Sequence, residues 1–109
     1  MKALAKFILF IMLSSSFLFA GEIYGDIKKD GEPIVQAEVE IVVGDKIYPK
    51  VNLDKYGSYS IYVEEEGECE LIVHYRGQRP SIKVHSYEGS VRYNLVLEEK
   101  EGKYYLRRD

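Results

Sequence analysis

The chain has 109 residues, enough for one small domain, and its single cysteine, Cys69, excludes an intramolecular disulfide. Its formal net charge of −3 argues against non-specific binding to nucleic acid, which requires basic residues to neutralise phosphates. Tryptophan is absent and there are ten tyrosines, whose hydroxyl groups need water or a polar partner when the ring is buried.

Residues 1–20 have the order of a secretory signal peptide. Lys2 and Lys6 make a basic start, an apolar run follows, and the small residue Ala20 ends the segment. We therefore predict cleavage after Ala20, a secreted or periplasmic location, and no stable membrane insertion of the product. The alternative is an uncleaved anchor, since the apolar stretch is just long enough to span a bilayer. The remaining domain, 21–109, holds 13 basic and 18 acidic residues, a formal charge of −5.

Apolar and polar residues alternate with period two after residue 20, which is typical of strands with one buried face. The sequence predicts strands at 23–28, 37–43, 46–51, 58–63, 69–75, 82–84, 91–97 and 103–107. Seven or eight short strands with turns about every 8–12 residues predict an all-β fold, a seven- or eight-stranded antiparallel β-sandwich.

Turn residues separate these strands. Asp30-Gly31 supplies the positive φ values of a tight reversal, and Gly57 is expected to have a positive φ for the same reason. Pro49 marks 46–51 as an exposed edge strand, because proline cannot donate to the ladder. We interpret the acidic run 64–66 as a solvated turn rather than a calcium site, since it lacks an Asp-rich loop.

Three segments share a known pattern. Residues 23–41 read I-Y-G-D-I, then D-G-E-P-I, then A-E-V-E-I; residues 54–61 read D-K-Y-G-S-Y-S-I; and residues 69–77 read C-E-L-I-V-H-Y-R-G. This pattern resembles the carboxypeptidase regulatory-like, or transthyretin-like, domain over about residues 22–98. The resemblance implies a prealbumin-type sandwich. It implies no single function, because such sandwiches serve as accessory modules, ligand carriers and structural subunits.

Transthyretin relatives include the 5-hydroxyisourate hydrolases, which end in a Tyr-Arg-Gly-Ser tetrapeptide. Here Tyr75-Arg76-Gly77-Gln78 lies in the middle of the chain and ends in glutamine. His74 and His85 do not occupy that family's histidine motifs. A small transthyretin-like hydrolase is therefore the least favoured alternative, and we predict no catalytic residues and no cofactor.

Several other residues suggest chemistry only weakly. His74 and His85 are expected to point away from the core and to lie opposite each other if their strands form a hairpin, which makes an incomplete metal site. Lys28 and Asn94 occupy strands that carry isopeptide pairs in some pilus sandwiches, but both are predicted to face solvent. Cys69 alternates in phase with apolar neighbours, so it is predicted to be buried and free.

Outward tyrosines are the feature that could mark a binding face, because tyrosine and arginine are favoured in recognition patches. The candidate binding surface comprises Tyr24, Tyr48, Tyr62, Tyr87, Arg79 and Arg92. The alternative reading is that tyrosine is simply a good strand former. We predict a non-enzymatic binding or accessory module that recognises another protein or an envelope polymer. The second hypothesis is a structural subunit that forms a homo-oligomer through a strand edge.

Overall fold

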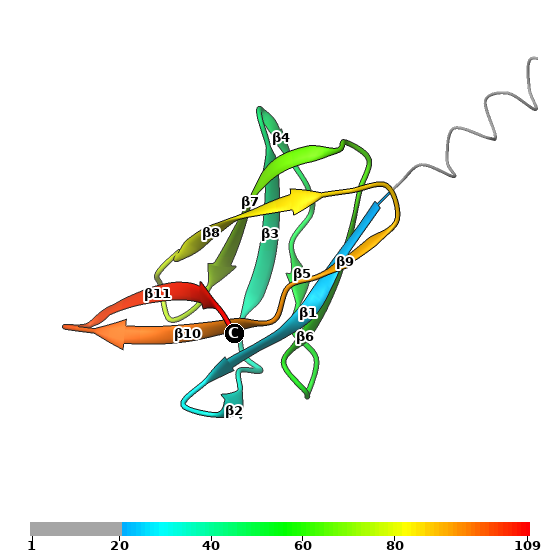
Figure 1. Cartoon of the computed structure of the whole chain (residues 1–109). Helices are drawn as coiled ribbons and strands as arrows, with labels where there is room; N and C mark the ends of the chain where they lie inside the picture. Colours follow the sequence, from blue (N-terminus) through cyan, green and yellow to red (C-terminus); the bar gives the residue numbers. More distant parts are fainter. Residues whose placement is uncertain (1–20) are drawn as a thin grey trace, which may run out of the picture.

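The computed structural model describes residues 21–109, so the predicted signal peptide lies outside the described residues. This part of the chain is all-β and forms two packed sheets, which confirms the predicted sandwich (Figure 1). Its strands are β1 (Gly21–Lys29), β2 (Glu32–Pro33), β3 (Glu38–Val43), β4 (Lys46–Ile47), β5 (Val51–Asn52), β6 (Ser58–Val63), β7 (Gly67–His74), β8 (Ser81–Ser86), β9 (Ser90–Arg92), β10 (Leu95–Lys100) and β11 (Lys103–Arg108). Within residues 21–109, no helix has the length and apolar character needed to cross a membrane.

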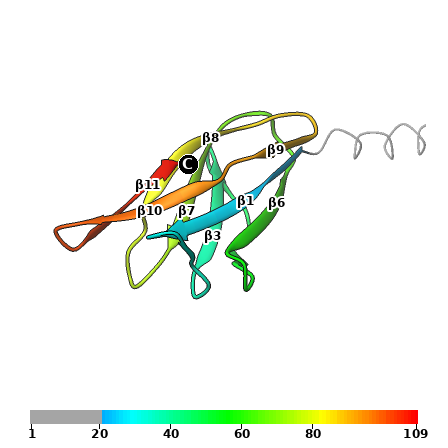
Figure 2. The same ribbon diagram turned by 60° about the horizontal axis from the view of Figure 1, so that its bottom comes forward.

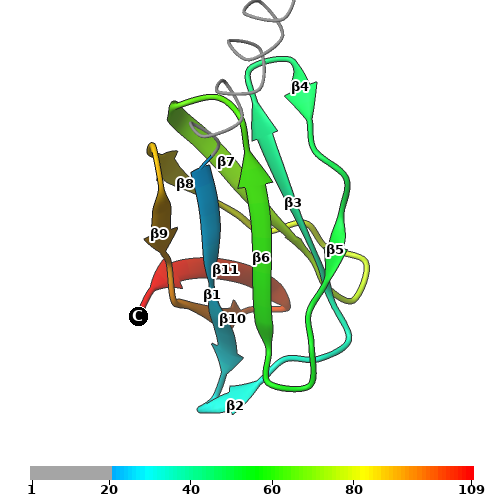
Figure 3. The same cartoon turned by 90° about the vertical axis from the view of Figure 1, so that its right-hand side faces the viewer.

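The first sheet is built around β1. Strands β6 and β2 pair antiparallel with one side of β1, while β9 and β10 pair parallel with its other side, and β11 extends the sheet from β10. Strands β9, β1 and β6 lie side by side in Figure 3. The two parallel pairings depart from the predicted antiparallel arrangement. They arise because the chain crosses from β8 in the second sheet and enters the first sheet running in the direction of β1.

The second sheet has the order β4-β3-β7-β8, with β5 also paired to β3, and all of its pairings are antiparallel. The β10–β11 hairpin projects beyond the body of the two sheets, as Figure 2 shows. The predicted strand 46–51 is divided into the short strands β4 and β5 because Pro49 interrupts the ladder. The predicted strand 91–97 is likewise divided into β9 and β10.

The core lies between the sheets and follows the predicted alternation. Its most deeply buried apolar residues are Ile23, Ile27, Val39, Ile41, Val63, Leu71, Val73, Leu95 and Leu97. Cys69 is buried and free, as predicted, and burial raises the pKa of its thiol. A buried, protonated thiol behaves as a small apolar side chain.

Candidate binding face

The outward side of β9, β1 and β6 brings together polar and aromatic side chains from three strands. Strand register places Ser90, Glu22 and Tyr62 in one row across the sheet, and Arg92, Tyr24 and Ser60 in the next row. A third row contains Asp26 and Ser58. We call this surface the β1 face; its residues are Glu22, Tyr24, Asp26, Ser58, Ser60, Tyr62, Ser90 and Arg92.

Hydrogen bonds fix both carboxylates of the β1 face. Glu22 accepts the Ser90 hydroxyl at 2.9 Å on one oxygen and the Ser60 hydroxyl at 2.5 Å on the other. Asp26 accepts the Ser58 hydroxyl at 2.7 Å. Each carboxylate oxygen of Glu22 therefore has a donor from a neighbouring strand, and its position does not depend on a ligand.

Tyr24 lies at the centre of the β1 face and is half-buried. The Arg92 guanidinium carbon lies 5.8 Å from the centre of the Tyr24 ring, close enough for a cation–π contact. Arg92 also contacts the second Asp26 oxygen at 3.5 Å and donates to the Asn94 side-chain oxygen at 3.1 Å. Tyr62, on the adjacent strand, keeps 68% of its surface exposed. The predicted residues Tyr24, Tyr62 and Arg92 thus share one face.

Two other predicted surface residues lie elsewhere. Tyr87 is exposed in the loop between β8 and β9, where its ring centre is 4.4 Å from that of His85. Arg79 belongs to the loop between β7 and β8 and lies 3.8 Å from the Glu40 carboxylate on the second sheet. Tyr87 and Arg79 therefore contact neither each other nor the β1 face, because their loops lie at different places in the sandwich.

The prediction that Tyr48 points outward is wrong. Its side chain is only 8% exposed, and its hydroxyl donates to the Glu65 carboxylate and accepts the Glu64 backbone N–H at 3.0 Å. Ile47 takes the outward position instead and is 64% exposed. The reason is the register of β4 on β3. Ile47 lies opposite Val42, and the Tyr48 N–H bonds to the carbonyl of the buried Ile41 at 3.0 Å, so the Tyr48 ring points into the core while its polar tip reaches the end of β6.

The expected pairing of the two histidines is also wrong. His85 lies opposite Glu68 on β7, whereas His74 lies opposite Glu38 on β3, so the two rings are far apart along the second sheet. His74 contacts the buried Glu40 carboxylate at 2.7 Å. Within residues 21–109, no group of three or more His, Cys, Asp or Glu side chains has the arrangement of a metal site.

Sequence reasoning missed the carboxylates and serines of the β1 face. Glu22 and Asp26 alternate with the inward residues of β1, and the three serines occupy outward positions on their strands. The sequence shows that alternation, but it does not show which strands lie beside β1. Ser90 on β9, for example, is 68 residues from its partner Glu22.

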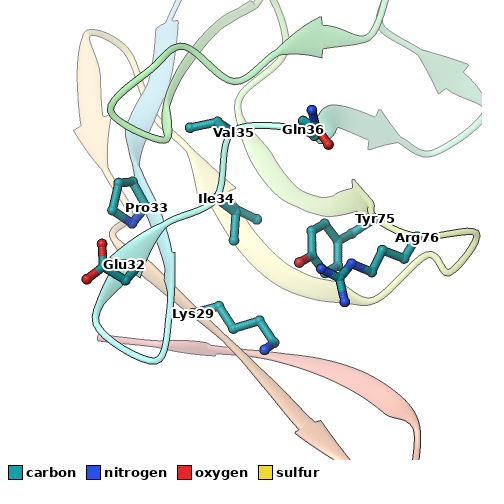
Figure 4. A pocket seen from close by; sticks show the side chains of 8 residues that line it. All are labelled: Lys29, Glu32, Pro33, Ile34, Val35, Gln36, Tyr75 and Arg76. Carbon is teal, nitrogen blue, oxygen red and sulfur yellow. The ribbon is translucent and has the colours of Figure 1, made fainter.

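A separate hollow of about 330 Å³ opens between the segment 32–36 and the start of the turn after β7 (Figure 4). It contains two cationic side chains, Lys29 and Arg76. Lys29 forms an ion pair with Asp30 at 3.2 Å, and Asp30 and, more weakly, Glu99 raise its pKa. The Arg76 guanidinium lies 5.1 Å from the Tyr75 ring centre. Asp30 pairs with Lys29 and the carboxylate of Glu32 also lines the hollow, so charges of both signs are present and do not select a ligand of one sign.

Side chains form hydrogen bonds with backbone groups along the outer edges of the sheets. On β8, the Tyr93 hydroxyl accepts the His85 N–H at 2.9 Å and donates to the His85 carbonyl at 3.2 Å. On β11, the Gln78 amide oxygen accepts the Tyr104 N–H, and its amide nitrogen donates to the Gly102 carbonyl in the turn that precedes the strand. These contacts shorten the runs of free backbone groups with which another strand could pair.

The comparisons with known proteins identify a structural likeness. No protein-family model matches the sequence, and no curated protein is similar to it. A solved structure that is similar is the crystal structure of a DUF3823 family protein from Parabacteroides merdae, with a TM-score of 0.52 and 12% sequence identity. The likeness covers 82% of this chain and 46% of that protein, so the chain spans less than half its length. At this identity the likeness supports the β-sandwich fold alone.

Proposed function

We propose that the chain is a non-enzymatic binding module that works outside the cytoplasm and recognises another protein or an envelope polymer. Within this proposal it is a transthyretin-like sandwich of the carboxypeptidase regulatory-like type, exported by residues 1–20. The observation that carries the proposal is the grouping of Tyr24, Tyr62 and Arg92 on the β1 face beside two fixed carboxylates.

This grouping suits recognition for two reasons. Tyrosine and arginine supply large contact area and dominate the energy of many interfaces. The hydrogen bonds to Glu22 and Asp26 hold the polar groups in place before a ligand arrives, so less side-chain freedom is lost on binding.

The experiment is a pull-down from a native envelope extract with the wild-type protein and the double variant Tyr24→Ser/Tyr62→Ser. A matched control is Tyr56→Ser/Tyr105→Ser, which removes two exposed rings, 65% and 50% exposed, that lie off the β1 face. Loss of a true anchor costs at least about 2 kcal/mol, some thirtyfold in affinity. We expect the first variant to lose the partner and the control to retain it, with thermal melts showing that both remain folded.

Equal retention by the wild type and Tyr24→Ser/Tyr62→Ser would overturn the proposal. The strand-edge hypothesis makes a different prediction, a concentration-dependent homo-oligomer in analytical ultracentrifugation. The Tyr93 and Gln78 contacts on β8 and β11 favour the binding module over that hypothesis, because they occupy backbone groups that edge pairing needs.

A further inference from the structure

The fixed carboxylates of the β1 face are hydrogen-bond acceptors with unused capacity. The two oxygens of Glu22 each accept one serine hydroxyl, and those of Asp26 accept Ser58 and Arg92. A carboxylate offers about four lone-pair positions, so each oxygen can accept another donor. Hydroxyl groups are strong donors to such charged oxygens. The β1 face is therefore built to receive O–H groups.

Arg92 adds donors to the same face. It uses its Nε on Asn94 and one terminal nitrogen on Asp26. A guanidinium has five N–H donors, so others remain for an incoming oxygen. Acceptors and donors therefore alternate around Tyr24, an arrangement that matches sugar hydroxyls, because each hydroxyl can both donate and accept.

Two rings supply the apolar part of the face. Tyr24 on β1 lies directly opposite Ser60 on β6, so Tyr62 is its diagonal neighbour, at a spacing of about 7–8 Å. Tyr62 has most of its ring free. The electron-rich faces of aromatic rings attract partially positive hydrogen atoms, and the C–H side of a sugar ring presents them. An extended chain of sugars can reach both rings.

Charge decides between ligand classes. The β1 face has two carboxylates and one guanidinium, a formal charge of −1, and the exposed Lys28 follows it as the next outward residue of β1. The domain as a whole carries −5, and that sign disfavours anionic polymers. Protein interfaces are depleted of charged residues at their centres, whereas three charged side chains surround Tyr24 here. A neutral, hydroxyl-rich partner satisfies both conditions.

We infer that the β1 face binds a neutral polysaccharide, with Tyr24 and Tyr62 contacting sugar rings and Glu22, Asp26 and Arg92 bonding to their hydroxyl groups. This inference rests on the proposed function, because it names the class of partner for the same face.

Affinity electrophoresis of the exported protein tests it. Native gels contain a β-glucan, an α-glucan, a mannan or a xylan, with polygalacturonate as the anionic comparison. We expect slowed migration in at least one neutral gel and none in polygalacturonate. Tyr62→Ser and the double variant Glu22→Gln/Asp26→Asn should each weaken that binding at least tenfold, whereas Tyr105→Ser, with its exposed ring on β11, should bind like the wild type.

Unchanged migration in every neutral gel, or slowing that the β1-face variants do not alter, would overturn the inference. If Tyr24→Ser/Tyr62→Ser still abolishes capture from envelope extract and the captured partner is a protein, the polysaccharide inference fails while the proposed function stands. If that variant also captures its partner normally, the proposed function fails as well.

Discussion

The side-chain oxygen of Asn94 lies 3.1 Å from the backbone nitrogen of Asp26 and accepts its N–H. This bond spans the interruption between β9 and β10, where a side chain replaces a backbone carbonyl as the partner of β1. Gly25 permits the close approach, since a Cβ there would lie 2.0 Å from the Tyr93 carbonyl oxygen. The same Asn94 oxygen accepts Arg92 Nε, so it connects the sheet backbone to the β1 face.

Replacing Asn94 by alanine should destabilise the domain. Asn94→Ala leaves the partly buried Asp26 N–H without its acceptor, which costs about 1–3 kcal/mol. Domains of this size lose roughly 4–8 °C of melting temperature per kcal/mol. Asn52→Ala on β5 is the control, because Asn52 is exposed and the change should stay within about 0.5 kcal/mol. Circular-dichroism melts give the melting temperatures of both variants. If Asn94→Ala melted at the same temperature as Asn52→Ala, this role for Asn94 would be contradicted.

Gly57 is required for two separate reasons. Its φ is 74°, as predicted for this turn, and a Cβ would lie 2.7 Å from the Ile27 carbonyl oxygen. Gly31 has a similar φ of 79° with no atom near the position of a Cβ. Gly31→Ala should therefore cost about 1 kcal/mol for conformation alone, and Gly57→Ala at least about twice that, because backbone must move. Urea denaturation compares them; similar midpoints would show that the Ile27 contact costs nothing.

The buried Tyr59 hydroxyl makes stability depend on alkaline pH. It donates to the Tyr93 carbonyl at 2.7 Å, and burial, with smaller effects from Tyr93 and Asp26, raises its pKa above the ordinary value of 10.0. An acidic group whose pKa is raised by folding contributes its full stabilisation of the folded state at pH values below its pKa in the unfolded chain. This contribution is lost as pH rises above 10 towards the folded pKa.

Unfolding free energies measured from pH 8 to pH 11 test this dependence. Tyr59→Phe should be less stable than the wild type at pH 8, because the bond to Tyr93 is missing, but should lose less stability as the pH rises. Parallel curves for the wild type and Tyr59→Phe would contradict this, because they would mean that Tyr59 ionises as readily in the folded protein as in the unfolded chain.

The strand phases could be predicted from the sequence because burial alternates along β1 and β6, and the core residues of β3 and β7 keep the same spacing although Glu40 and Ile72 between them are also buried. Ile23 and Ile27 on β1, and Leu71 and Val73 on β7, lie in the core as their spacing indicates. A one-residue shift would expose every one of them, so the pattern admits only one solution. The same logic placed Tyr62 on the outside.

The partners across strands could not be predicted. Arg92 meets Tyr24 because β9 runs parallel to β1 in a register set by the crossover from the second sheet, and no local pattern encodes that register. The inward position of Tyr48 depends on register as well. The pairing of β4 with β3 sets Tyr48 beside the buried Ile41, and the short stretch 46–49 contains no pattern that reveals this pairing.

Substitutions of Tyr48 test whether its ring lies in the core, as in the structure, or faces solvent, as the sequence predicts. Its ring is buried and its hydroxyl contacts both Glu64 and Glu65. Tyr48→Phe keeps the ring and leaves the Glu64 N–H without that acceptor, so it should cost about 1–2 kcal/mol. Tyr48→Ser also removes the ring from the core and should cost about 3–5 kcal/mol, as for other buried aromatic side chains.

Tyr62→Ser is the matched comparison, because its ring is exposed and its loss should cost about 1 kcal/mol or less. Guanidinium denaturation of the three variants gives the order Tyr62→Ser, Tyr48→Phe, Tyr48→Ser from the smallest loss to the largest. If Tyr48→Ser unfolds at the same midpoint as Tyr62→Ser, the Tyr48 ring faces solvent after all, and its hydroxyl does not hold the end of β6. A large loss for Tyr48→Ser with none for Tyr48→Phe would instead assign the whole effect to the ring, and would make the contacts with Glu64 and Glu65 energetically neutral.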